Sequence, residues 1–260
     1  EYNDIGIKNT WSNNTLVDNT TIRNNGYGVW DYESYTASYM NSRFVNNSYY
    51  DYKFMIDTDE NHYYVLDVFD KSLININGTG NKPIVFYGYY DYNDSNLFTI
   101  SNWNNNFSQL ILAGASGTVN NVSMSGNHRN GIDVIGGTIY GGAINFTNLQ
   151  INHTQMPIHI YQSTEHVNIK NSSFNSNNIG ITIETSFGVI IDNCTISNTE
   201  TVAGLRVIGS TNNITIVNST FFNNTGAGLQ IKASPGLAGW GYDFTEGGTK
   251  NPYNIFIFNN

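Results

Sequence analysis

Five ionisable side chains recur in one frame of the sequence at intervals of about two dozen residues. They are Asp133, His159, Glu184, Arg206 and Lys232. Two carboxylates on either side of a glycosidic bond can hydrolyse it. A base beside a cation can instead remove a proton next to a uronate carboxylate and stabilise the charge that forms. These five residues are the catalytic candidates if the protein is an enzyme; solvated pairs across neighbouring strands are the alternative.

The frame is set by a short phrase in which two aliphatic residues flank one variable residue, usually after a glycine. The phrases begin at Ile132, Ile158, Ile181, Leu205 and Leu229, which are separated by 26, 23, 24 and 24 residues. The variable position gives one column of side chains: Asp133, His159, Thr182, Arg206 and Gln230. Two residues further on lies a second column: Ile135, Tyr161, Glu184, Ile208 and Lys232. If the phrases are stacked strands, each column occupies one side of a sheet.

Each repeat holds three short runs of alternating apolar and polar residues, and no period of 3.6 residues is sustained. One such unit cannot bury its apolar side alone. Successive units coiled into a stack can, because like strands pair in parallel about 4.8 Å apart and inward residues form columns. We therefore expect an all-β solenoid of three short parallel sheets and roughly ten rungs, in which helices have no place.

Asparagine recurs at one corner of the repeat, directly after the second apolar run. The positions are Asn19, Asn41, Asn148, Asn171, Asn193 and Asn218. Asparagine tolerates tight turns, and its amide both donates and accepts hydrogen bonds. A ladder of side-chain amides, each bonding the next, is expected at this corner.

These phrases resemble the right-handed parallel β-helix of the pectin-lyase-like superfamily. The resemblance assigns Gly-Ile-X-Ile to the first sheet, Ile-X-Ile-X-Asn to the second and Ser-X-Phe to the third. It implies that polysaccharides would bind, and be cleaved, on the first-sheet face and its neighbouring loops. One continuous solenoid is expected, with regular rungs over 1–54, irregular rungs with insertions over 55–118, and regular rungs over 119–260 with a long loop at 234–253. Both ends of the sequence fall inside a rung, which predicts an uncapped excerpt of a longer chain.

The order of motifs also resembles that of the polygalacturonase family, without its catalytic residues. Asn130 stands where that family has a catalytic Asp, and Ala203 replaces its His. Of its basic motif only Lys232 is present. The resemblance therefore implies a shared fold more strongly than a shared activity.

The composition excludes several classes of function. The chain has 260 residues, a net charge of −9 and 12% charged residues. An acidic chain is a poor partner for nucleic acid or an anionic membrane, both of which need clustered Lys and Arg. A single cysteine excludes a disulfide scaffold and a Cys-based zinc site. No apolar run is long enough to span a membrane. So few ionisable groups favour a scaffold over an enzyme.

Glycosylation signals are twice as frequent as chance placement would make them. Fourteen Asn-X-Ser/Thr sites occur, and we predict N-glycans on them: Asn13, Asn19, Asn46, Asn77, Asn93, Asn106, Asn121, Asn145, Asn152, Asn171, Asn193, Asn213, Asn218 and Asn223. Asn-Ser and Asn-Thr also recur in the turns of the repeat, which is a second explanation for the excess of Asn-X-Ser/Thr sites. Either explanation is compatible with an extracellular protein at a cell surface.

Aromatic side chains are the candidates for carbohydrate binding. Trp240, Tyr242 and Phe244 lie in the long loop beside the first sheet, and Tyr161 lies in the second outward column. Rings in such places stack on sugars or contact partners, or else fold back onto the core. Tyr-rich stretches over 32–39, 49–52 and 87–92 are expected to make a low-charge, adhesive surface.

No cofactor and no metal site is predicted with named ligands. Acidic stretches at 57–61 and 91–96 are candidates for Ca²⁺, although the second lacks the glycine and glutamate of an EF-hand loop. Solvated loops are the alternative for both.

The favoured function is a non-enzymatic, N-glycosylated extracellular rod used in adhesion or filament assembly. Its partners would be polysaccharide or neighbouring surface-protein subunits, as in Asn- and Tyr-rich adhesin-like proteins of microbial surfaces. A lyase or glycoside hydrolase acting on an acidic polysaccharide at the first-sheet face is the alternative. A carbohydrate-binding module without chemistry is the third. This choice rests on analogy of fold.

Overall fold

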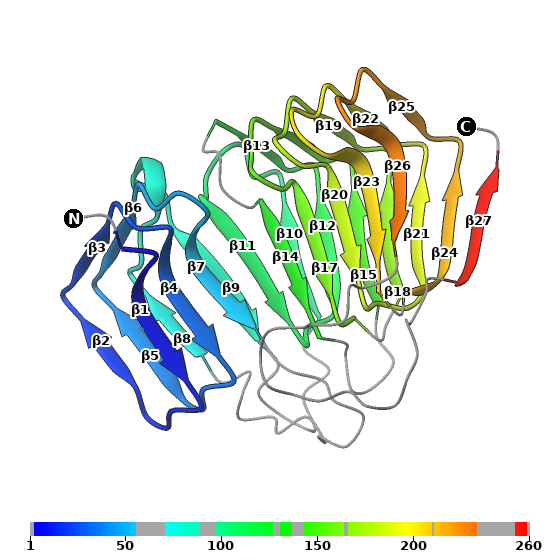
Figure 1. Ribbon diagram of the computed structural model, residues 1–260. Helices are drawn as coiled ribbons and strands as arrows, with labels where there is room; N and C mark the ends of the chain where they lie inside the picture. The colour runs from blue at the N-terminus through cyan, green and yellow to red at the C-terminus, as the bar shows by residue number, and fades with distance from the viewer. Residues whose placement is uncertain are drawn as a thin grey trace.

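The computed structural model describes residues 3–55, 71–88, 97–126, 131–136, 143–163, 166–209, 211–232 and 253–258. In these residues short strands coil into a parallel β-helix of about eight turns (Figure 1). The expected ten rungs are a slight overestimate. Dividing the chain length by the repeat assumes that every residue lies in a rung, whereas the described strands make about eight turns. The only helical element in the described part is one 3₁₀ turn, η2 (Thr79–Asn81).

Most of the chain forms one long stack with three parallel sheets. The first sheet runs in the order β26-β23-β20-β17-β14-β11-β9. Its strands are β9 (Ile84–Gly88), β11 (Gln109–Ala113), β14 (Ile132–Ile135), β17 (Ile158–Tyr161), β20 (Ile181–Glu184), β23 (Ala203–Ile208) and β26 (Ala227–Lys232). The last five of these strands contain the phrases that begin at Ile132, Ile158, Ile181, Leu205 and Leu229, so the sheet assigned from the sequence is confirmed, and β9 and β11 extend it.

The other two sheets of this long stack complete each turn. The second sheet consists of β10 (Phe98–Ser101), β12 (Gly117–Asn120), β15 (Ala143–Thr147), β18 (His166–Lys170), β21 (Val189–Asp192), β24 (Asn212–Val217) and β27 (Tyr253–Phe258). The third consists of β13 (Ser123–Ser125), β16 (Gln150–Asn152), β19 (Ser173–Asn175), β22 (Thr195–Ser197) and β25 (Thr220–Phe222). All of these strands pair in parallel.

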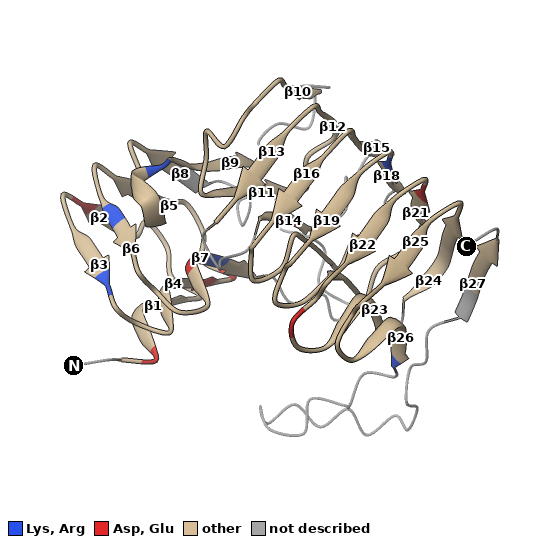
Figure 2. Ribbon diagram, turned by 90° about the horizontal axis from the view of Figure 1, so that it is seen from above, with Lys and Arg blue, Asp and Glu red and all other residues tan. Residues whose placement is uncertain are grey.

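A shorter N-terminal stack repeats the same plan. Its first sheet is β1 (Ile5–Thr10), β4 (Tyr27–Tyr32) and β7 (Tyr50–Met55); its second is β2 (Leu16–Asp18), β5 (Ala37–Met40) and β8 (Lys71–Ile74); its third is β3 (Thr21–Arg23) and β6 (Arg43–Val45). Figure 2 shows the two stacks meeting at an angle instead of sharing one axis.

The interior is filled by columns of equivalent aliphatic side chains. In the first sheet Ile160 pairs with Ile183, and Ile183 pairs with Val207; all three are fully buried. In the second sheet Val167 pairs with Val189 in the same way. Because a shift of one residue would turn every inward side chain outward, burial fixes the register of each strand.

The asparagine corner is confirmed. Asn171, Asn193 and Asn218 have φ values of 50°, 51° and 51°, a left-handed conformation that asparagine tolerates. The amide Nδ2 of Asn193 donates to Asn171 Oδ1 at 2.9 Å. At other rungs the acceptor is the residue just before the corner, as where Asn218 Nδ2 donates to Asp192 Oδ1 at 3.3 Å. The ladder therefore includes carboxylates as well as amides.

The two stacks share a second hydrophobic core, at a place we call the elbow. Leu110 and Leu112 of β11 point into the long stack, whereas the alternate residues Ile111 and Ala113 pack with the interior of the N-terminal stack. Ile135 of β14 does the same. The N-terminal stack thus covers the outer face of the first sheet at β11 and β14.

The expected surface of tyrosines is correct only in part. Tyr39 and Tyr52 are fully buried, while Tyr49 is half exposed. The hydroxyls of Tyr39 and Tyr52 donate to Asp31 Oδ2 at 3.0 and 2.9 Å. Much of the aromatic content of this region therefore fills a core that contains one carboxylate satisfied by hydroxyls.

The register predicts opposite consequences for two adjacent isoleucines of β21. Ile191 is fully buried in the central column, so Ile191→Ala should lower the free energy of unfolding by about 2–5 kcal/mol through lost burial and a cavity. Ile190 points outward, so Ile190→Ala should cost less than about 1 kcal/mol. Urea unfolding of the two variants measures the difference, and equal losses would contradict the register.

Candidate functional site

The first sheet aligns the candidate residues in two rows on its outer face. Asp133 pairs with His159, His159 with Thr182, and Thr182 with Arg206. In the second row Tyr161 pairs with Glu184, and Glu184 with Ile208. Each phrase buries its aliphatic pair and so turns the residue between them outward. Arg206 and Glu184 are therefore diagonal neighbours on adjacent strands.

His159 lies between two carboxylates. Its Nδ1 is 3.5 Å from Asp133 Oδ1, and its Nε2 is 3.7 Å from Glu184 Oε2. The three side chains come from β14, β17 and β20, so three successive rungs contribute one group each. The exposure of these side chains rises from strand to strand, from 4% for Asp133 to 15% for His159 and 36% for Glu184. Solvent thus reaches this trio from the Glu184 side.

Asp133 is held from behind by Gln109. The Nε2 group of Gln109 donates to Asp133 Oδ2 at 2.7 Å and to the backbone oxygen of Tyr52 at 2.8 Å. Tyr52 belongs to β7, the last strand of the N-terminal first sheet. One glutamine therefore ties the candidate site to the elbow.

Lys53 of β7 adds a cation that the sequence columns of the long stack did not include. Its Nζ lies 4.4 Å from the centre of the Trp30 ring, 5.2 Å from Tyr27 and 5.4 Å from Tyr50. The charges of Asp133 and Glu184 also act on it. Lys53 thus connects an aromatic cluster of the N-terminal stack with the carboxylates of the long stack.

The pKa values of this group show how strongly its charges are coupled. Burial alone would lower the pKa of His159, but hydrogen bonding and charge from Asp133 and Glu184 outweigh it and raise the pKa. Burial would raise the pKa of Glu184, but His159, with Lys53 and Arg206, lowers it. Burial lowers the pKa of Lys53, opposed by the two carboxylates. The site therefore favours charged forms of His159 and Glu184.

Beyond the trio, the outward row carries three buried polar atoms. Thr182 Oγ1, Arg206 Nε and Gln230 Oε1 have no hydrogen-bond partner within the described part of the chain. They lie on β20, β23 and β26, one after another along the row. A buried polar atom without a partner costs free energy, so each would gain from a ligand that offers one.

The remaining predicted residues lie elsewhere. Lys232 is exposed and pairs with Ile208, two strands away from Glu184, so it stays outside the trio. Tyr161 is half-buried against the second core, with its ring 5.8 Å from that of His159. Trp240, Tyr242 and Phe244 lie outside the described residues, as do the acidic stretches 57–61 and 91–96.

The described ranges contain no cluster of three His, Cys, Asp or Glu side chains suited to a metal ion. Nor do they contain a helix long and apolar enough to cross a bilayer.

Sequence reasoning missed Gln109, Lys53 and Trp30. Lys8, Trp30 and Lys53 are paired across β1, β4 and β7, in the same frame as the outward row of the long stack. Extending that column to the N-terminal phrases would have found them. Their approach to Asp133 and Glu184 depends on the elbow, for which no local pattern gives a signal.

The comparison with protein families agrees with this geometry. The family described as right-handed β-helix region matches residues 108–239, which are 132 of the 260 residues. The chain belongs to the right-handed β-helix family. No curated protein and no solved structure matches the chain. The β-helix family name describes a fold, so function has to be argued from the site.

The surroundings of Glu184 favour its ionised form. A glycoside hydrolase needs one carboxyl group that keeps its proton until it protonates the leaving group. Here Asp133 and Glu184 both face the same imidazole, and the pKa of Glu184 is lowered. Such an arrangement holds Glu184 ionised and leaves it suited to accepting hydrogen bonds.

The coupled pKa values predict a pH window for stability. The folded pKa of His159 is raised, so its contribution is fully present below about 6.5 and is lost as pH rises through the folded value. The folded pKa of Glu184 is lowered, so its contribution is present above about 4.5 and is lost as pH falls through the folded value. His159→Gln should therefore destabilise most between pH 4.5 and 6.5.

Urea unfolding of wild type and variant across a pH series measures this window. The control is His153→Gln, because His153 is exposed and has no carboxylate within ion-pair distance among the described residues. A His159→Gln effect that stays constant from pH 4.5 to well above 6.5 would contradict the coupling.

Proposed function

We propose that this β-helix is a rigid, N-glycosylated extracellular rod that contacts polysaccharide through the outer face of its first sheet and catalyses no reaction there. The rod would serve adhesion or assembly at a cell surface. The extracellular rod is the function favoured by the sequence, and the polar groups of the outward row supply its contact with polysaccharide.

The observation that carries the proposal is the row of unpartnered polar atoms beside the trio. Thr182 Oγ1 can donate and accept, Arg206 Nε donates, and Gln230 Oε1 accepts. A chain of sugars presents hydroxyls that donate and accept at short intervals. Arg206 and Gln230 are half-buried, so a rotation of either side chain would bring its polar atom to such a ligand, whereas a purely apolar partner would leave it unpaired. Thr182 is 2% exposed, so its hydroxyl would join the contact only after the groups that cover it move.

The charges of the trio support binding over catalysis. His159 is compensated by Asp133 and Glu184, and Lys53 adds a further cation close by. A pre-arranged set of charged groups orients hydroxyls well, because hydrogen bonds to charged groups are stronger than those between neutral groups. None of these groups has to change its protonation state for a ligand to bind.

The positions of the glycosylation signals are compatible with glycans. None of the thirteen described sequon asparagines is buried. Nine are exposed: Asn13, Asn19, Asn46, Asn106, Asn121, Asn171, Asn193, Asn218 and Asn223. Four are half-buried: Asn77, Asn145, Asn152 and Asn213. Asn93 lies outside the described residues. Exposed asparagines such as Asn13 and Asn106 leave room for a sugar, whereas Asn171 and Asn193 already bond each other in the corner ladder.

The glycan contact is tested by affinity electrophoresis in gels that contain polysaccharide. We expect Arg206→Ala to weaken binding of the polysaccharide by about tenfold, because the sugar loses the hydrogen bond from a charged donor. Lys170→Ala removes an exposed cation from the second sheet and should leave binding unchanged. Equal retardation of Arg206→Ala and wild type would contradict the proposal. Mass spectrometry of the native protein tests the glycans, and no occupied sequon would remove that part.

A lyase or hydrolase is the second candidate, because an imidazole flanked by carboxylates, with Arg206 nearby, is the kind of group that moves protons. We expect purified protein to release no unsaturated or reducing ends from uronate polymers, since the paired environment of His159 and Glu184 favours their charged forms. Release by wild type that His159→Gln abolishes would establish the enzyme and overturn the non-catalytic rod.

A further inference from the structure

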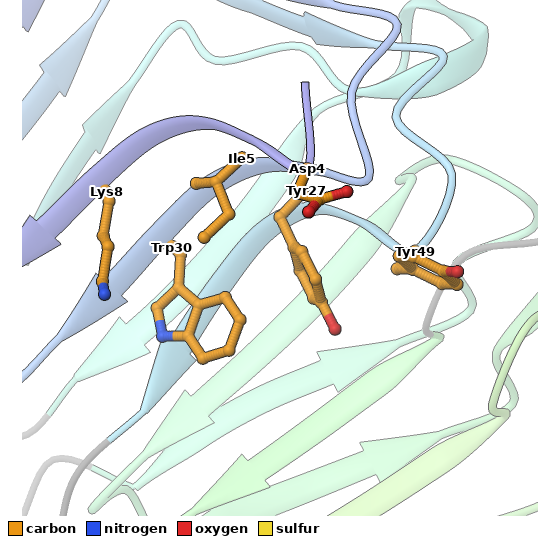
Figure 3. Close-up of a pocket in the computed structure, with 6 residues that line it drawn as sticks. All are labelled: Asp4, Ile5, Lys8, Tyr27, Trp30 and Tyr49. Carbon is orange, nitrogen blue, oxygen red and sulfur yellow. The ribbon is translucent and has the colours of Figure 1, made fainter. Parts of the chain in front are cut away.

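The outer face of the N-terminal first sheet has a hollow that is separate from the outward row. Its volume is about 260 Å³, and it is lined by Asp4, Ile5, Lys8, Tyr27, Trp30 and Tyr49. Ligand pockets usually enclose roughly 300–1,000 Å³, so this hollow suits a group the size of one sugar ring. Figure 3 shows Ile5 and Lys8 on β1 and Tyr27 and Trp30 on β4, with Asp4 just before β1 and Tyr49 just before β7. The Trp30 and Tyr27 rings point to the same side of β4.

Three rings form most of the apolar surface of the hollow. The centres of Tyr27 and Trp30 are 4.8 Å apart at an interplanar angle of 56°, and those of Tyr27 and Tyr49 are 5.4 Å apart at 39°. Tilted rings around a depression present both faces and edges to whatever occupies it. A pyranose ring has an apolar face of C–H groups and a rim of hydroxyls, which matches such a surface.

Trp30 is held by a residue outside the lining of the hollow. Lys53 Nζ lies 4.4 Å from its ring centre, and Lys53 does not line the hollow. Tyr27 is fixed in the same way by Tyr50, whose ring is stacked against it at 5.8 Å and 16°. A ring that is already held loses little conformational freedom on binding, which favours affinity.

The charges in the hollow select among sugars. Among the described residues that line it, Asp4 and Lys8 are the ionisable side chains apart from the tyrosines, and they carry opposite charges. Together they offer one acceptor and one donor for hydroxyls without a net charge. A uronate or sulfated sugar would meet Asp4 as well as Lys8, so the hollow offers it no net local charge to offset the −9 of the whole chain, whereas a neutral sugar meets no such repulsion.

We propose that this hollow is a stacking subsite for a neutral pyranose unit, with the sugar ring against Trp30 and Tyr27 and its hydroxyls bonded to Asp4 and Lys8. The inference deepens the proposed glycan contact and rests on it. It adds a binding position on the N-terminal stack and names the class of sugar.

The test is titration calorimetry of the full chain with neutral and with uronate oligosaccharides. We expect neutral oligosaccharides to bind more tightly, and Trp30→Ala to weaken that binding by about tenfold or more. Trp11→Ala is the matched control, because Trp11 belongs to the same stack, is 56% exposed and does not line the hollow. Trp30→Phe keeps a ring in place and should retain part of the affinity, which guards against a variant that fails to fold.

The outcomes separate this inference from the proposed function. If Trp30→Ala binds like wild type while Arg206→Ala is weakened, the stacking subsite is wrong and the first-sheet contact stands. If wild type binds no neutral sugar, or prefers uronates, the inference is overturned. If Trp30→Ala changes only the sedimentation of the protein, the hollow is a contact between copies and the inference is overturned as well.

Discussion

Every feature of this molecule depends on the parallel pairing of each rung with the next in one register. Val167 pairs with Val189, and Ile160 with Ile183, so the interior is a set of aliphatic columns. A corner asparagine in the left-handed conformation ends the second run of each regular rung. Because inward and outward residues alternate, the same pairing aligns Asp133, His159 and Arg206 outside. Core and candidate site are two sides of one constraint.

At the elbow the first sheet of the N-terminal stack does not continue into that of the long stack. The contact between the two stacks brings charged and polar side chains from both of them together. In the described part of the chain β7 ends the N-terminal sheet, and its Tyr52 carbonyl accepts a hydrogen bond from the Gln109 side chain. The same Gln109 side chain also donates a hydrogen bond to Asp133. The same approach brings Lys53 within electrostatic range of Asp133 and Glu184, and its Nζ lies 4.4 Å from the ring of Trp30, which lines the hollow. Groups about eighty residues apart in sequence are thus held in one place.

The repeat made the fold and the outward rows predictable, because spacing alone determines which side chains share a column. It also predicted the asparagine corner, although not the part that Asp192 takes in the ladder. Local patterns could not show that the N-terminal stack packs against β11 and β14. The long stack contributes Ile111 and Ile135 to that contact, and both occupy positions that face outward in an ordinary rung. For the same reason Tyr39 and Tyr52 resembled surface residues, whereas Asp31 holds their hydroxyls in a buried core. The predicted count of ten rungs was slightly high, because it assigned every residue of the chain to a rung.

The central claim is that the β-helix binds glycan along its first-sheet faces on both sides of the elbow. The most direct measurement is an NMR map of the whole chain during titration with a neutral oligosaccharide. The account predicts perturbed signals from Trp30 and Tyr27 and from Thr182 and Arg206, with the asparagine corner of the second sheet unchanged. Perturbations confined to the second and third sheets, or none at saturating sugar, would contradict it.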